Sequence, residues 1–367
     1  MKIGFFTDSY FPQINGVTYT INLWKRELEK QGHEVFIYFP KDKGYEPEKN
    51  EIELRSLPFI FYKGYALGLP SFKKVEKDLD VVHIQSPATM GLFGLAVSRK
   101  QQIPCIVTHH TPPDMYLNEI SPIRNEFMQE ALKVAYYKYE RELLERCQLV
   151  TAPSQAMIDM LKERLEGYID KAIYFSNGTD TDFFKEKKTD KFKKDYDVPN
   201  GKVIGFAGRH TTEKHVEDLI EVARDFDGTV LIGGLGPLTE QYREMAKGLE
   251  NVKFLGFLPR ERLPEFYSTL DLLIMPSTAE TEGLVVLEAN ACGTPAIGAD
   301  ALALKTTIED DVNGYHYNPG DVSELKKQIE KGYKDIQKLK KGSKKKAEER
   351  SVKETVKKLI KIYNELK

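Results

Sequence analysis

Residues 202–206 read KVIGF, a short apolar run that begins directly after a polar, lysine-rich segment containing Pro199. The start of the chain has a comparable run, because Lys2–Phe6 reads KIGFF. Short apolar runs bounded by polar residues are typical of strands that lie buried in a parallel sheet. We therefore expect each of the two runs to open its own series of strands and helices.

The first series extends to residue 182. A helical pattern from about Thr18 to Lys30 follows the first strand and ends at Gly32. Further strands are expected at Val35–Phe39, Val81–Ile84, Ile106–Thr108 and Leu149–Ala152, with helices at 91–100 and 126–146. This alternation predicts a doubly wound α/β domain over residues 1–182.

The second series begins at residue 183, where the composition turns to Lys and Asp. Strands are expected at 203–207, 229–232, 252–255, 272–275 and 295–298, and helices are expected to begin near Val216, Thr239, Leu263 and Leu284. A helical, lysine-rich tail follows from Glu324. Because 367 residues exceed the usual size of a single core, two Rossmann-like domains are expected.

Charge and composition exclude several classes of protein. Lys and Arg number 54 and Asp and Glu 56, and this near-balance argues against nucleic acid as the partner. The three cysteines are widely spaced, as is typical of reduced thiols in a cytosolic protein. No apolar run approaches the ~20 residues of a spanning helix. We expect a cytoplasmic protein, soluble or at most peripheral at the inner face of the membrane.

The loop after the fourth strand of the second series carries the strongest functional signal. Glu280 and Glu288 are separated by seven residues, the first in the loop and the second in the following helix. Gly283 permits close approach of a ligand, and the free amides of Leu284 and Val285 at the helix start can bind an anion. Glu282, between the two carboxylates, is expected to be a surface charge.

This stretch resembles the E-x7-E signature of glycosyltransferase family 4, whose members have the GT-B fold. The resemblance implies two Rossmann-like domains facing across a donor-binding cleft, with Glu280 on the donor sugar, Glu288 on the ribose and residues 283–285 on the diphosphate. It also implies a donor domain over residues 183–345 and a final helix, about 346–367, that crosses back to the first domain.

Four further donor contacts follow from the residues and from the resemblance. Arg209 and Lys214 lie five residues apart after a strand and Gly208, a spacing that suits a diphosphate and resembles the family's G-R-x(4)-K element. Gly16 matches the family's glycine beside the donor phosphates, and Leu258 lies in the loop that holds the base. Arg209, Lys214, Glu280 and His110 are the expected catalytic residues.

His110 follows a strand of the first domain. The resemblance places a histidine of this loop beside the reacting sugar carbon, and alignment with the family's T-Y-H-T form favours His110 over His109. Asp8, Tyr10 and Tyr116 are expected on the acceptor side.

Other classes of protein fit the sequence less well. A nicotinamide-dependent oxidoreductase would need a G-x-G-x-x-G after the first strand, which the chain lacks. A non-catalytic nucleotide-sugar-binding protein stays as an alternative. There is no D-x-D in a donor loop and no spaced histidine ligand pair, so we expect no metal site and no cofactor, the nucleotide sugar being a substrate.

The resemblance is nearest to the family-4 subgroup that glucosylates diacylglycerol. It implies a retaining reaction from a nucleotide diphosphate sugar, UDP-glucose by preference, to a membrane lipid head group. The aromatic stretch Leu57–Phe72 could lie at a lipid interface or fold onto its own domain. Soluble sugars and polysaccharides stay as alternative acceptors.

Overall fold

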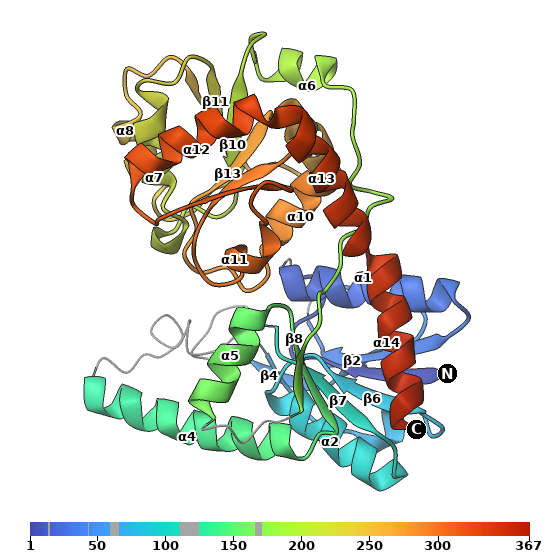
Figure 1. Cartoon of the computed structure of the whole chain (residues 1–367). Coiled ribbons are helices and arrows are strands. Elements are labelled where there is room, and N and C mark those ends of the chain that lie inside the picture. The colour runs from blue at the N-terminus through green and yellow to red at the C-terminus, as the bar shows by residue number, and fades with distance from the viewer. Residues whose placement is uncertain (14, 43, 59–65, 111–124, 166–170) are drawn as a thin grey trace. The chain divides into compact units, whose positions relative to one another are not determined.

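The computed structural model describes residues 1–13, 15–42, 44–58, 66–110, 125–165 and 171–367 (Figure 1). Its contacts divide the chain into two compact units. The first unit comprises Met1–Asn177 together with Thr355–Lys367, and the second comprises Gly178–Glu354. The divisions expected from sequence lie at 182/183 and 345/346, five residues after the first division and nine before the second.

In the described part of the first unit, seven parallel strands form one sheet in the order β3-β2-β1-β6-β7-β8-β9. One of its inner strands, β1, pairs in register with both neighbours, so that Ile3 lies between Val35 and Val81. The strands are β1 (Lys2–Phe6), β2 (Glu34–Pro40), β3 (Glu51–Leu54), β6 (Val81–Ile84), β7 (Cys105–Thr108), β8 (Leu149–Ala152) and β9 (Ala172–Tyr174). A separate antiparallel pair joins β4 (Ser56–Pro58) to β5 (Ala66–Gly68).

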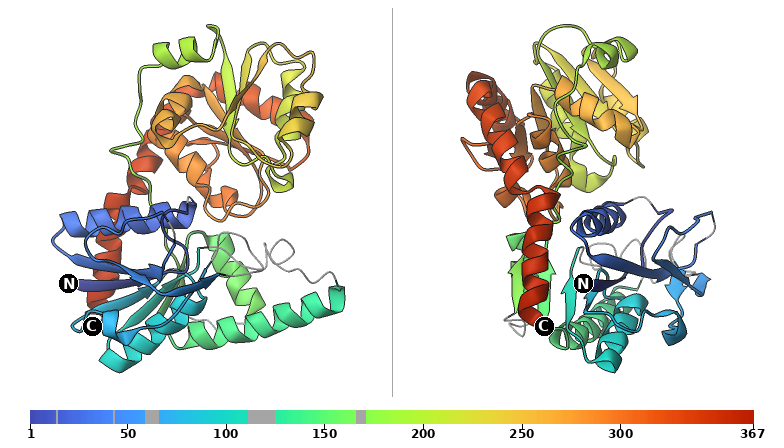
Figure 2. Two further views of the ribbon diagram at one scale, coloured as in Figure 1. Left: turned by 180° about the vertical axis from the view of Figure 1, so that it is seen from behind. Right: turned by 90° about the vertical axis from the view of Figure 1, so that its right-hand side faces the viewer.

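Helices cover both faces of this sheet, because successive strand residues point to opposite sides. Phe5 packs edge-on against Trp24 of α1, whereas Phe6 packs against Phe93 of α2. Figure 2 shows α1 on one side of the sheet and α2 with α4 on the other. The helices are α1 (Gly16–Lys30), α2 (Thr89–Gln101), α4 (Glu126–Glu145) and α5 (Gln155–Arg164), and α14 (Val352–Leu366) enters this unit from Thr355.

The second unit has a parallel sheet of six strands in the order β12-β11-β10-β13-β14-β15. Its strands are β10 (Val203–Ala207), β11 (Thr229–Gly233), β12 (Val252–Gly256), β13 (Leu272–Met275), β14 (Ala296–Ala299) and β15 (Gly314–Tyr317). Its helices are α6 (Asp190–Asp195), α7 (Val216–Ala223), α8 (Thr239–Met245), α9 (Leu263–Thr269), α10 (Leu284–Ala291), α11 (Leu304–Thr307), α12 (Val322–Lys334) and α13 (Ile336–Glu349).

A buried ion pair ties α1 to the edge of the first sheet. Nζ of Lys25 lies 2.7 Å from Oε1 of Glu51, and their side chains are 3% and 1% exposed. Burial opposes ionisation of Glu51, but hydrogen bonds from Lys25, Tyr45, the Glu48 amide and Tyr10 outweigh it and lower its pKa. The carboxylate is therefore stabilised by donors from several segments.

Replacing Lys25 by methionine should destabilise the first unit, because the carboxylate of Glu51 would stay buried without its cation. The expected loss is about 3 kcal/mol, which thermal unfolding would detect as a lower midpoint. Lys30→Met is the matched control on the same helix, since the Lys30 side chain is 66% exposed and its pairing with Glu27 should matter little. Equal midpoints for the two variants would contradict the prediction.

Candidate active site

The expected donor-binding residues gather at one edge of the second sheet. All strands of this sheet are parallel, so the loops after β10, β11, β12 and β13 emerge at the same edge. We call the loops 208–215, 234–238, 257–262 and 276–283 the carboxyl edge of the second unit. Arg209, Lys214, Leu258, Glu280 and Gly283 all lie on it.

Lys214 and Glu280 form an ion pair in this edge. Nζ of Lys214 lies 2.5 Å from Oε1 of Glu280 and 3.4 Å from Oγ of Ser277, and the paired side chains are 17% and 14% exposed. The two loops are also joined through their backbones, because the Thr278 amide donates to the Glu213 carbonyl at 3.0 Å. The structure thus brings together the cation expected at the diphosphate and the carboxylate expected at the sugar.

Arg209 lies on the same loop as Lys214, which backbone contacts hold in place. The amide of Gly208 donates to the Gly233 carbonyl at 3.1 Å. Gly234 has a φ of +114°, and a Cβ there would lie 1.8 Å from the Gly208 carbonyl oxygen, so only glycine fits. Arg209 is exposed, and in the described part of the chain its guanidinium has no ion-pair partner. Leu235, where the family has Asp, is 49% exposed.

Gly283 begins helix α10 in the left-handed conformation, with φ +79°. The amides of Leu284 and Val285 are the first of the helix and have no carbonyl four residues back to bond within it. Both residues are half-buried, so this end of the helix remains accessible. Glu282 is 2% exposed, which corrects the expectation of a surface charge: it lies within the fold, where Thr307 Oγ1 donates to its backbone carbonyl at 2.6 Å.

The Glu288 side chain, on α10, makes polar contacts that the sequence did not reveal. The hydroxyl of Tyr267 donates to Oε2 at 2.8 Å, and a guanidinium nitrogen of Arg260 lies 3.8 Å from Oε1. Burial raises the pKa of Glu288 to about 7, although Arg260 and Tyr267 act against the rise. Arg260 follows β12 at the carboxyl edge, so its position could have been noticed in the sequence; Tyr267, inside α9, gave no signal.

Leu258 does not present its side chain to a ligand. It is 7% exposed and belongs to the hydrophobic core of the second unit. Its neighbour Phe257 is 68% exposed. A base bound by this loop would therefore meet the backbone of residue 258 or the ring of Phe257, but not the Leu258 side chain.

The structure distinguishes the two histidines that follow β7. Nε2 of His109 lies 2.7 Å from Oε1 of Glu140, and both side chains are fully buried. Glu140 also accepts from Tyr136 at 2.8 Å and pairs with Arg164 at 3.5 Å. His109 is thus part of a buried polar cluster and is not a rival for the role at the sugar.

His110 lies in different surroundings. Nε2 of its imidazole is 2.9 Å from Oε1 of Gln85, and the ring centre of Trp24 is 6.1 Å away. The side chain is 5% exposed. Burial, assisted by His109, lowers the pKa of His110 to about 3 against a hydrogen bond with the Asn177 side chain, so the ring is neutral at physiological pH. A neutral imidazole can donate or accept a hydrogen bond without placing a charge beside a substrate.

Two residues expected on the acceptor side have structural roles. The carboxylate of Asp8 accepts from Ser86 Oγ at 2.7 Å, Thr89 Oγ1 at 2.8 Å and the Met90 amide at 3.0 Å, which caps the start of α2. Burial raises the pKa of Asp8 against these hydrogen bonds. An acceptor that bound to the Asp8 carboxylate would have to displace these hydrogen bonds.

Tyr10 requires a correction. It is 3% exposed and donates its hydroxyl to Oε1 of Glu51 at 2.8 Å, so it packs inside the first unit and does not face an acceptor. Gly16 is exposed at the first turn of α1, directly after the capping residue Asn15. Tyr116 lies outside the described residues.

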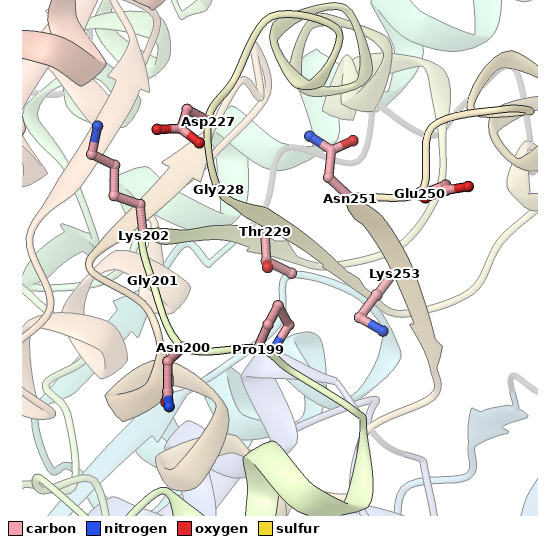
Figure 3. Close-up of a pocket in the computed structure, with 10 residues that line it drawn as sticks. All are labelled: Pro199, Asn200, Gly201, Lys202, Asp227, Gly228, Thr229, Glu250, Asn251 and Lys253. Carbon is pink, nitrogen blue, oxygen red and sulfur yellow. The ribbon is translucent and has the colours of Figure 1, made fainter.

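A hollow of about 500 Å³ lies elsewhere in the second unit (Figure 3). Lys202, Thr229 and Lys253 border it, and these residues lie at or near the starts of β10, β11 and β12. The hollow is therefore at the opposite edge of the sheet from Lys214 and Glu280. None of the expected site residues lines it.

Comparison with known proteins agrees with this arrangement. The family model described as Glycosyltransferase Family 4 matches residues 14–183, and the model Glycosyl transferases group 1 matches residues 187–350. The solved structure of Anabaena HepE with UDP covers 100% of both chains with a TM-score of 0.77 and 21% identity. The structure of sucrose-phosphate synthase from Thermosynechococcus elongatus covers 100% of this chain and 98% of its own, with a TM-score of 0.76 and 18% identity.

Two doubly wound parallel-sheet units with this edge chemistry define a glycosyltransferase of the GT-B fold. The alpha-monoglucosyldiacylglycerol synthase of Streptococcus pneumoniae is 30% identical over 340 residues, covering 86% of this chain and 75% of that protein. The enzyme of the same name from Acholeplasma laidlawii is 28% identical, covering 88% and 86%. The chain therefore belongs to glycosyltransferase family 4 and is similar to these diacylglycerol glucosyltransferases.

The raised pKa of Glu288 predicts that binding of a nucleoside diphosphate depends on pH. The ionised carboxylate accepts hydrogen bonds from a ribose better than the protonated form does. Affinity should therefore rise roughly tenfold between about pH 6 and pH 8 and level off above.

Isothermal titration with UDP across this range measures the effect. Glu288→Gln is the control, because the phosphate of the ligand titrates equally with both proteins and only the carboxylate differs. A pH dependence of the same size in the variant would show that Glu288 does not contact the ligand.

Proposed function

We propose that the protein is a retaining, metal-independent hexosyltransferase that takes its sugar from a nucleotide diphosphate sugar, with UDP-glucose as the first choice. The observation that carries the proposal is the pairing of Lys214 with Glu280 at the carboxyl edge, which also carries Arg209, without an ion-pair partner among the described residues, and the first amides of α10. Cations, amides and a sugar-binding carboxylate within one edge suit a ligand that joins a diphosphate to a sugar.

Some of these protein groups would bind the diphosphate of such a donor, and others its sugar. Arg209, Lys214 and the amides of Leu284 and Val285 bind the diphosphate, while Glu280 accepts hydrogen bonds from sugar hydroxyls. Glu288 binds the ribose. Lys214 pairs with Glu280 in the ligand-free protein, so the donor exchanges this contact for one between Lys214 and phosphate and leaves the carboxylate to the sugar.

The rate acceleration comes from charge stabilisation. As the bond from the anomeric carbon to the phosphate breaks, negative charge grows on the leaving diphosphate and positive charge on the sugar. Arg209 and Lys214 neutralise the negative charge on the diphosphate, as a metal ion does in other transferases. His110 contacts the sugar side as a neutral ring. Departure and attack on the same face of the sugar give a retained, α-linked product.

The acceptor we propose is a membrane lipid head group. Two similar proteins are named for diacylglycerol glucosylation, and the sulfoquinovosyl transferase of Arabidopsis thaliana is 25% identical over 88% of this chain. GDP-mannose-dependent alpha-mannosyltransferases are also similar, such as that of Corynebacterium glutamicum at 28% identity over 86% of this chain. Transfer of another hexose, or to a soluble acceptor, is therefore the second candidate.

Exposed apolar side chains on the first unit support contact with a lipid surface. The first half of α4 extends beyond the sheet in Figures 1 and 2. Its Phe127 is 84% exposed and Val134 59%, two helical turns apart on one face. Leu57, at 55%, is the most exposed large hydrophobic residue described in the stretch first expected at a lipid interface. None of the described helices has the length and apolar character of a membrane span.

Substitution of the donor cations tests the reaction. Arg209→Ala and Lys214→Ala should each lower turnover by about a hundredfold, or ~3 kcal/mol, because each removes a charge-assisted contact that strengthens in the transition state. Lys253→Ala, at the hollow on the opposite edge, is the matched control and should leave turnover unchanged. Wild-type turnover in the Arg209 or Lys214 variant would refute the assignment.

The same assay tests whether the reaction needs a metal ion and whether the product is the α or the β anomer. Turnover should survive EDTA, and proton NMR should show an α-linked product. Loss of activity on chelation that one added metal restores would contradict metal independence, and a β-linked product would contradict retention.

The acceptor is tested by offering radiolabelled UDP-glucose together with diacylglycerol vesicles and soluble sugars. Label should enter the lipid fraction. The double variant Phe127→Ser, Val134→Ser should transfer more slowly to vesicles yet normally to detergent-dispersed lipid, because it lowers surface binding and not chemistry. Leu92→Ser on α2, which is 47% exposed, is the control. Label found only in soluble sugars would reject the lipid acceptor.

A further inference from the structure

Gln85 is a buried polar residue next to His110. It follows β6 directly, and its backbone amide donates to the Phe6 carbonyl at 2.8 Å. Strand β6 pairs with β7 in the sheet, so the end of β6 stands beside the end of β7, which carries His110. The side chain of Gln85 is 1% exposed. Strand pairing thus places an amide group against the imidazole.

The contact between the two side chains sets the position of a proton. Oε1 of Gln85 lies 2.9 Å from Nε2 of His110. An amide oxygen only accepts, so the neutral ring must carry its hydrogen on Nε2. Nδ1 is then the nitrogen with the lone pair, and the side chains of Asn177 and His83 are the other polar neighbours of the ring. Trp24, whose ring lies beside that of His110, limits the rotation of the imidazole.

The adjacent histidine has a partner of different chemistry. His109 contacts the carboxylate of Glu140, within a cluster that also contains Arg164. The pairing with His109 helps to hold the pKa of Glu140 low against its burial. His109 thus has an ionised partner, whereas His110, one residue later, has an amide that carries no charge.

We propose that Gln85 is a positioning residue of the transfer reaction, whose amide oxygen holds His110 in the neutral Nε2–H tautomer beside the reacting sugar. The inference rests on the proposed function, because it takes His110 as the residue next to the sugar carbon. A carboxylate in the place of Gln85 would favour the imidazolium form. That positive charge would oppose the positive charge that develops on the sugar as the leaving group departs.

The other end of the amide supports this role. Nε2 of Gln85 has no hydrogen-bond partner among the described residues. Buried amides that serve stability normally use both their oxygen and their nitrogen. Gln85 uses its oxygen on His110, which indicates that the contact with the ring is what this residue contributes.

The tautomer can be measured without reference to activity. Long-range proton–nitrogen NMR of the full-length protein, with ¹⁵N-labelled histidine, should show His110 as the neutral Nε2–H form, and its signals can be identified by their loss in His110→Ala. In Gln85→Leu the signals should shift toward a mixture of both tautomers. An Nδ1–H form in the wild type, or unchanged signals in Gln85→Leu, would overturn the inference.

Kinetics separate positioning from a merely structural effect. Gln85→Leu should lower kcat about tenfold to hundredfold with little change in KM for the donor, because the ring is misplaced in the transition state. Gln85→Glu should raise the pKa of His110, so that kcat falls as the pH falls through the raised value. Gln148→Glu is the control. Gln148 accepts a hydrogen bond from the Cys105 amide at the amino end of β7, far from His110 along the strand, so this variant should leave the pH profile unchanged.

The outcomes distinguish this inference from the proposed function. A pH profile of Gln85→Glu identical to that of the wild type, in a protein with normal circular dichroism, would contradict the positioning role. Absence of glycosyl transfer by the wild type would contradict the proposed function, whereas the NMR result on His110 would still decide whether Gln85 sets its tautomer.

Discussion

Because all strands of each of the two large sheets run in one direction, residues that are far apart in the chain are brought to a single edge. Lys214 and Glu280 are separated by 66 positions and yet share an ion pair, since the strands that precede them, β10 and β13, are neighbours. The same holds in the first unit, where the paired strands β6 and β7 bring Gln85 to His110. Strand order thus determines which functional groups can meet, and the loops only adjust their distances.

The carboxyl edge of the second unit and the surroundings of His110 in the first unit differ in charge. The carboxyl edge of the second unit holds a guanidinium, an ammonium and a carboxylate within loops that glycines keep close together, as Gly234 shows against Gly208. Around His110 the first unit places an amide and an indole, and burial keeps the imidazole neutral. This contrast fits a reaction in which one part of the substrate is a dianion and the other acquires a transient positive charge.

Much of this arrangement was predictable from the sequence. The central strands and the first residues of α7, α8, α9 and α10 were expected where they occur, because buried strands and helix starts have local patterns. Strands β3, β9 and β15 were not expected: each lies at a sheet edge and has only three or four residues, and Glu or His interrupts the apolar run in β3 and β15. The contacts of Asp8 and Tyr10 could not be foreseen, since their partners, the start of α2 and Glu51, are distant in the chain.

The C-terminal segment belongs to the first unit, and this has a consequence for biosynthesis. Tyr363 of α14 places its hydroxyl 2.7 Å from Nδ1 of His83, whose Nε2 lies 2.6 Å from Thr108 at the end of β7. The first unit is therefore completed only by residues made some 250 positions after the strand that carries His110. A chain truncated before residue 355 would keep every residue of the second unit and yet lack the segment that contacts His83 in the first.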